Sequence, residues 1–145
     1  MPDIAARKLG RLREELAFLR AHAQVPLAQW AGDGMLRRSV ERALQTAIEA
    51  CIDLGRHLVL VACWGEPATG REVAGALMAH GVLTEAQARL LGEMIGFRNI
   101  LVHEYDVVDE TAVWAVLTRH LDDLCAIGAA LARGLSAAAP ADGAG

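Results

Sequence analysis

The chain has 145 residues, of which 54% are hydrophobic and 22% charged, and its formal net charge at pH 7 is −4. This length suits one compact domain, and the apolar fraction excludes intrinsic disorder for the body of the chain. Aromatic residues make up only 4%, which together with abundant alanine and leucine favours helices over a β-sandwich. An acidic chain is a poor general binder of nucleic acid, so any such role requires a local cluster of arginines.

Three features of the sequence bear on where the protein works. The longest nearly uncharged run, Leu58 to Gly65, is too short to cross a bilayer, and no secretory signal follows Met1. The three cysteines have no Cys-x-x-Cys spacing, so we interpret them as small core residues in a reducing compartment. These observations predict a cytoplasmic protein that does not associate with membranes.

The apolar periodicity predicts four long helices and one short helix. The first runs from about Asp3 to Ala23 and is closed by proline at position 26, because a residue before proline avoids helical geometry. The second begins near Asp33, a suitable N-cap, and extends to about Ala62. Its apolar seam, which suits packing inside an antiparallel bundle, consists of Val40, Leu44, Ala47, Cys51, Leu54, Leu58 and Val61.

Turn signals place the next two helices. After a loop at residues 65–70, a short helix covers roughly residues 71–80 and stops at Gly81, a good residue just beyond a helix end. Thr84 and Gln87 then form a capping box that opens the fourth helix.

The last helix is predicted to begin near Asp109 or Glu110 and to run without a break to about Leu135. Beyond it, residues 136–145 are rich in alanine, proline and glycine and have nothing to bury. We therefore predict one all-α helical-bundle domain over residues 1–135 and a disordered tail over residues 136–145.

A polar stripe runs along the second predicted helix, on the face opposite its seam. Its members follow one another at steps of three or four residues: Arg38, Arg42, Gln45, Glu49, Asp53 and Arg56. One interpretation is a solvated face with ion pairs between successive turns. The other is that Arg38 and Arg42, like charges one turn apart, are placed to bind an anion or a carboxylate of a partner.

The segment 98–105 gathers an arginine, an asparagine, a histidine and the single tyrosine of the chain between two apolar helices. On an uninterrupted helix, His103 would lie about 140° from Arg98. Joint action of these two side chains therefore requires that the helix end or bend near residues 101–103, or that two chains share the site. A structural interpretation is also open, because arginine and histidine near a helix C-terminus interact favourably with the helix dipole.

The same segment resembles the Arg-x4-His-x-Tyr motif of the HepT family, HEPN-domain toxins encoded beside MntA-type nucleotidyltransferase antitoxins. Arg98, His103 and Tyr105 match all three positions of the motif. Residues 40–54, 81–83 and 94–99 also resemble the family, so the resemblance extends from about residue 37 to residue 120. It implies a HEPN-type helical bundle that acts as a homodimer and cleaves RNA without a metal.

The resemblance implies a role for each residue of the motif. His103 would serve in acid–base catalysis, Arg98 would hold the phosphate, and Asn99 would hydrogen-bond the ribose or the phosphate. A symmetric dimer would bring two such histidines into one cleft. Tyr105 would receive AMP from the cognate antitoxin enzyme, which would silence the toxin by placing negative charge beside the site.

The expected partners are RNA, a second copy of the chain and an MntA-like nucleotidyltransferase antitoxin. Arg38 and Arg42 are candidate contacts for RNA or for this partner. No cofactor is expected, because the five histidines lack metal-ligand spacing and no glycine-rich phosphate loop is present. The alternative is a HEPN accessory subunit that docks on a nucleotidyltransferase and presents its substrate without cutting RNA.

Overall fold

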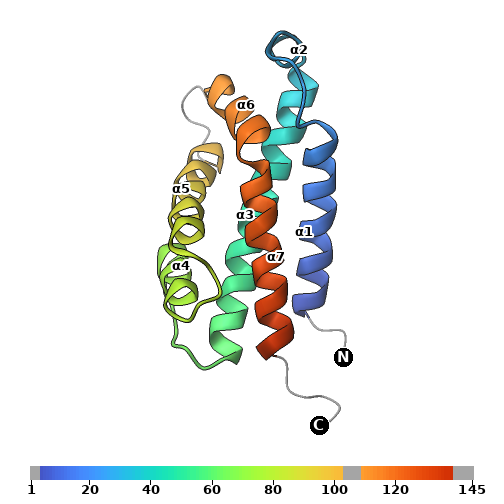
Figure 1. Cartoon of the computed structure of the whole chain (residues 1–145). Helices are drawn as coiled ribbons and strands as arrows, with labels where there is room; N and C mark the ends of the chain where they lie inside the picture. Colours follow the sequence, from blue (N-terminus) through green and yellow to red (C-terminus); the bar gives the residue numbers. More distant parts are fainter. Residues whose placement is uncertain (1–3, 103–108, 139–145) are drawn as a thin grey trace.

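The computed structural model describes residues 4–102 and 109–138, and within these ranges every regular element is a helix (Figure 1). The predicted all-α fold is confirmed, although these ranges hold seven helices rather than the five expected. They are α1 (Ile4–Ala21), α2 (Leu27–Gly32), α3 (Gly34–Val61), α4 (Gly70–Ala79), α5 (Glu85–Val102), α6 (Glu110–Arg119) and α7 (Leu121–Ala138).

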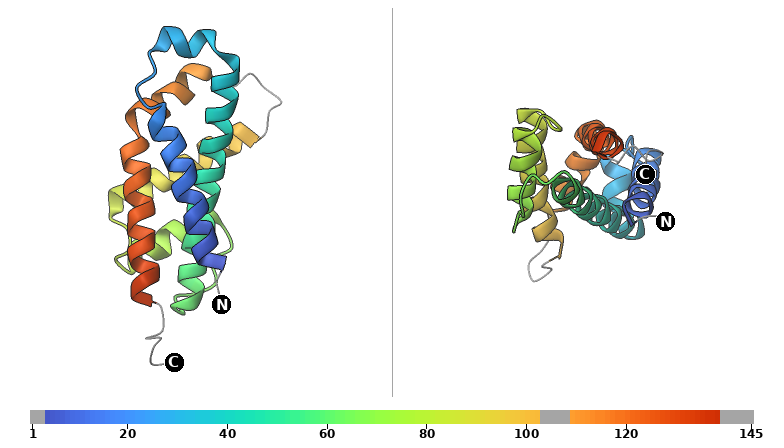
Figure 2. Two further views of the ribbon diagram at one scale, coloured as in Figure 1. Left: turned by 90° about the vertical axis from the view of Figure 1, so that its right-hand side faces the viewer. Right: turned by 90° about the horizontal axis from the view of Figure 1, so that it is seen from below.

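The long helix α3 is the centre of the molecule. It contacts each of the other described helices, with α1 on one side and α4 and α5 on the other, while α7 runs alongside (Figures 1 and 2). Gly55 permits the close approach of α4, because a Cβ atom there would lie 2.8 Å from Val73 Cγ1 and 2.9 Å from Leu77 Cδ1. The partners of α3 therefore leave its remaining face to carry the polar stripe.

The apolar seam of α3 is buried as predicted, except at its end. Its members from Val40 to Leu58 have 0% exposure, whereas Val61 is 50% exposed and the neighbouring Leu60 is 48% exposed. The seam therefore ends one turn before the helix does. The buried part belongs to one continuous hydrophobic core that includes residues of all seven described helices.

The helix starts predicted from capping residues are confirmed. The Asp33 side chain accepts a hydrogen bond from the backbone N–H of Leu36 at 3.0 Å, so it is the N-cap of α3. Thr84 and Gln87 exchange two side-chain-to-backbone hydrogen bonds of 3.0 Å each, which is the expected capping box. Asp109 caps α6, because its Oδ1 accepts from the backbone N–H groups of Thr111 at 3.1 Å and Ala112 at 3.2 Å.

Helix α2 is absent from the prediction, and tertiary contacts explain its formation. Trp30 is 1% exposed and donates a hydrogen bond from Nε1 to the backbone oxygen of Glu110 at 2.9 Å. From α3, Arg37 Nη1 donates to the carbonyl oxygens of Trp30 at 2.9 Å and Ala31 at 2.6 Å. A six-residue helix is thereby held by contacts from α3 and α6, which periodicity within the segment does not reveal.

The predicted uninterrupted last helix is wrong, because it divides at His120 into α6 and α7. There the backbone departs from helical geometry, with φ −118° and ψ 5°. Leu117 and Leu121, on either side of the break, are both buried, so the apolar pattern continues through it. Helix α7 then extends to Ala138, three residues into the predicted tail, whose remainder, residues 139–145, lies outside the described residues.

The three cysteines occupy different environments, so the prediction of a common core role holds for one of them. Cys51 is fully buried, and this burial raises the pKa of its thiol to about 12. Cys125 is half-buried and Cys63 is exposed. Among the helices that the structure describes, none is both long and apolar enough to cross a membrane.

Candidate functional site

Arg98 lies one turn before the end of the described part of α5 and faces α3. Its Nη1 atom is 3.5 Å from Glu49 Oε2, and the two side chains are 26% and 39% exposed. The Nε–H group of Arg98 is buried and has no hydrogen-bond partner among the described residues. The arginine is therefore held by one carboxylate, and its partly exposed guanidinium has further N–H donors besides Nη1–H and the buried Nε–H.

The other predicted catalytic residues are not brought against Arg98 by any described contact. Asn99 is exposed, next to Ile100, which is 59% exposed. His103 and Tyr105 lie outside the described residues, so their placement relative to Arg98 stays a prediction.

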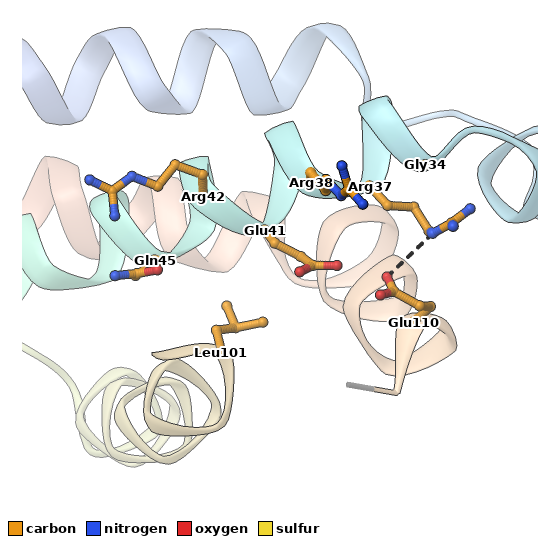
Figure 3. Close-up of a pocket in the computed structure, with 8 residues that line it drawn as sticks. All are labelled: Gly34, Arg37, Arg38, Glu41, Arg42, Gln45, Leu101 and Glu110. Carbon is orange, nitrogen blue, oxygen red and sulfur yellow. Dashed lines mark ion pairs between the residues drawn. The ribbon is translucent and has the colours of Figure 1, made fainter. Parts of the chain in front are cut away.

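The arginines predicted to bind an anion line a pocket of about 690 Å³ (Figure 3). We call this the arginine pocket; α3 supplies most of its lining, and Leu101 of α5 and Glu110 of α6 close it. Arg38 and Arg42 are exposed and have no ion-pair partner among the residues that the structure describes. The full lining of the arginine pocket is Gly34, Arg37, Arg38, Glu41, Arg42, Gln45, Leu101 and Glu110.

Arg37 has a different role from its neighbours in the pocket. Besides binding the carbonyl groups at the end of α2, its Nε atom lies 3.7 Å from Glu110 Oε2, as the dashed line in Figure 3 marks. Arg37 therefore ties α2 and α6 to α3 and holds the pocket wall in place, while Arg38 and Arg42 keep their charge available.

Within the described part of the chain, the polar stripe of α3 contains both paired and unpaired side chains. Glu49 pairs with Arg98 of α5, and Asp53 pairs with Lys8 of α1 at 3.2 Å. Neither pair connects successive turns of α3. Arg38 and Arg42 are exposed, so the stripe is solvated as the first interpretation expects, but no ion pair between members of the stripe is found among the described residues. The two carboxylates of the stripe are paired with basic residues of other helices, and the two arginines at its N-terminal end line the arginine pocket.

A second groove lies between α1 and α3 and includes residues that sequence reasoning missed. We call it the α1–α3 groove; its volume is about 290 Å³. Helix α1 contributes Arg7, Lys8 and Arg11, and α3 contributes Thr46, Glu49, Ala50 and Asp53. The spacing of Arg7 and Arg11, one helical turn apart on a face that α3 flanks, is the sequence signal that could have identified it.

Within residues 4–102 and 109–138, no group of three or more histidine, cysteine, aspartate or glutamate side chains could hold a metal ion.

Comparison with known proteins identifies related chains. Residues 12–129 match the family described as ribonuclease HepT-like. An mRNA nuclease HepT of Shewanella oneidensis is 33% identical over 96 residues, which cover 66% of this chain and 72% of that protein. A tRNA nuclease HepT of Aphanizomenon flos-aquae is 27% identical over 117 residues, 81% and 80% of the two chains.

A solved structure shows the same architecture. It is a tri-AMPylated Shewanella oneidensis HEPN toxin in complex with an MNT antitoxin, and it is 27% identical to this chain with a TM-score of 0.81. The superposition covers 92% of this chain and 99% of the toxin. Fold and sequence together therefore define the class, an all-helical ribonuclease with HEPN toxins as structural neighbours. The chain belongs to the HepT-like ribonuclease family, the HEPN toxins of MntA–HepT toxin–antitoxin systems.

Proposed function

We propose that this chain is a metal-independent endoribonuclease toxin whose site combines Arg98 and His103 from both subunits of a homodimer. The observation that carries the proposal is the half-buried Arg98, whose Nη1 is held 3.5 Å from Glu49 Oε2 while the side chain stays 26% exposed. A guanidinium in that state suits a phosphate, because it binds oxyanions through paired hydrogen bonds. Family membership and the matching histidine position supply the catalytic partner.

The proposed reaction uses the RNA's own nucleophile. The 2′-oxygen forms a bond to the adjacent phosphorus while the bond from phosphorus to the 5′-oxygen breaks, which yields a cyclic phosphate and a free 5′-hydroxyl. One His103 accepts the proton of the 2′-hydroxyl, and the second His103 of the dimer donates a proton to the leaving oxygen. Arg98 stabilises the charge that develops on the phosphate oxygens, and Asn99 hydrogen-bonds the ribose or phosphate.

Cleavage of RNA by the purified chain tests this proposal. We expect cleavage in the presence of excess EDTA, and a loss of about 10²- to 10⁴-fold in Arg98→Ala and in His103→Ala. Arg133→Ala, which removes an exposed arginine from α7, is the control and should cut normally. Wild-type protein that binds RNA without cutting it, under conditions where the dimer is intact, would contradict the proposal and favour the accessory-subunit alternative.

We further propose that an MntA-like nucleotidyltransferase silences the toxin by transferring AMP from ATP to the hydroxyl of Tyr105, with release of pyrophosphate. Support comes from the related toxin whose solved structure is described as tri-AMPylated and bound to an MNT antitoxin. Added phosphodiesters bring negative charge and bulk, which compete with RNA phosphate for the site.

The variant Tyr105→Phe tests the modification, because it lacks the acceptor oxygen while keeping the ring. We expect this variant to arrest growth even when the antitoxin enzyme is active, and the mass of the purified chain to stay unmodified. Rescue of growth by the antitoxin in this variant would show that neutralisation works through binding instead. A catalytically inactive antitoxin expressed with the wild-type toxin is the matched control and should fail to rescue.

A further inference from the structure

We propose that the α1–α3 groove binds the sugar–phosphate backbone of the RNA beside the cleavage site, through Arg7 and Arg11. The inference rests on the proposed ribonuclease function and extends it to a substrate-binding surface. Nothing in the Arg-x4-His-x-Tyr segment points to α1, so this surface follows from the arrangement of the helices alone.

Glu49 links the groove to Arg98. Glu49 contacts Arg98 from α3 and also lines the α1–α3 groove, so the two features meet at one carboxylate. One turn earlier on α3, Gln45 lines the arginine pocket. From Arg38 to Asp53, the stripe that lines both cavities spans about 22 Å along the helix axis. A single RNA strand following α3 would thus pass the arginine pocket, Arg98 and the α1–α3 groove in that order.

The charges along this path favour a polyanion, although the whole chain has a net charge of −4. The lining of the two cavities, taken with Arg98, contains seven basic side chains against four acidic ones. Positive charge is thereby concentrated on the α3 stripe and the surfaces that flank it. Local excess of this kind is what phosphate binding by an acidic protein requires.

Within the groove, the two arginines are the groups available to a ligand. Lys8 is paired with Asp53 at 3.2 Å. Arg11 is 64% exposed and lies 3.8 Å from Glu15, a long surface contact that contributes little stability and can be exchanged. Arg7 has no ion-pair partner among the described residues. Two guanidinium groups one turn apart repel each other slightly, and a bound phosphate removes that repulsion.

RNA binding measured apart from cleavage tests the inference. The full-length chain carrying His103→Ala is titrated against a fluorescein-labelled single-stranded RNA of about 12 nucleotides, at several salt concentrations. We expect the added pair Arg7→Ala/Arg11→Ala to weaken binding about tenfold at low salt. The slope of log K against log salt should become shallower by about 1.4, because each phosphate contact on a single strand contributes about 0.7.

The matched control is Arg13→Ala, which removes an exposed arginine from α1 that does not line the groove. It should leave both affinity and slope nearly unchanged. Equal effects of the control and the double variant would overturn the inference. A double variant that binds RNA normally but loses its dimer, or loses binding to the antitoxin, would also overturn it and assign the groove to a protein contact. Cleavage by the wild-type chain is assayed in parallel, so that a failure of the ribonuclease proposal is recognised separately.

Discussion

At the scale of single residues, the contact between Arg98 and Glu49 determines how the guanidinium is presented to the RNA phosphate. The carboxylate fixes one end of the guanidinium, and the buried Nε–H has no described acceptor. The same negative charge also opposes an incoming phosphate. Glu49 therefore acts in two ways, by positioning the arginine and by weakening its attraction for RNA.

This dual action yields a prediction for Glu49→Ala. Without the carboxylate, we expect kcat to fall about tenfold because the guanidinium is less well placed, while KM stays equal or decreases because one repulsive charge is gone. Glu49→Gln keeps a hydrogen-bond acceptor of the same shape and should recover part of kcat. Steady-state kinetics on a short RNA measure both constants.

The control for this prediction is Asp122→Ala. Asp122 also forms an arginine–carboxylate pair between helices, with Arg20 of α1 at 3.1 Å, but it lies on α7 away from Arg98. Its removal should leave kcat and KM unchanged. A Glu49→Ala enzyme with normal kcat, or a parallel loss in Asp122→Ala, would show that Glu49 does not position the arginine.

The partner of Arg98 also marks a limit of sequence reasoning. The spacing of Glu49 and its neighbours predicts that they share one face of α3, and they do. Spacing within one helix does not say which residue of another helix meets that face. The Arg98–Glu49 and Lys8–Asp53 pairs join residues 49 and 45 positions apart, so only the packing of helices reveals them.

At the scale of elements, signals that act within a few residues were predictable. Asp33, Asp109 and the Thr84–Gln87 pair all bind backbone groups within three positions, so both partners of each hydrogen bond lie in one short segment of the sequence. Such caps also place the arginine pocket, because α3 and α6 both begin at its edge. The start of α3 at Gly34 brings Arg37 and Arg38 into its first turns.

Elements that depend on distant partners were not predictable. Helix α2 is held by Trp30, which donates a hydrogen bond to the backbone oxygen of Glu110. Trp114 of α6 in turn holds the loop before α2, because its Nε1 donates to the backbone oxygen of Val25 at 2.8 Å. These two tryptophans connect the region before α3 with the start of α6. The break at His120 has the same character, because it reorients α6 toward these contacts without altering the apolar period.

At the scale of the whole molecule, the helices that line the two cavities differ from those that only cover the core. Helices α1 and α5 flank α3 (Figure 2). With α6, these three helices supply the residues that line the arginine pocket and the α1–α3 groove, whereas α4 and α7 supply none. Yet each chain carries a single histidine in the motif, and acid–base cleavage of RNA needs a proton acceptor and a proton donor. The proposed site is therefore complete only in a dimer, a feature that no single chain can display.

That requirement gives a prediction about mixed dimers. Wild-type chains and His103→Ala chains are co-expressed in varied ratios with different tags, and the RNase activity of the total dimer pool is measured. If one cleft uses both histidines, mixed dimers are nearly inactive and activity follows the square of the wild-type fraction, so an equal mixture keeps about a quarter. If each subunit cuts alone, activity is proportional to the wild-type fraction, and the equal mixture keeps about half.

Purified mixed dimers, isolated through both tags, distinguish the two cases directly. As the control, mixtures of wild type with Arg133→Ala should retain full activity at every ratio. A mixed dimer with half of the wild-type activity would refute a cleft shared between the subunits while leaving the ribonuclease proposal intact.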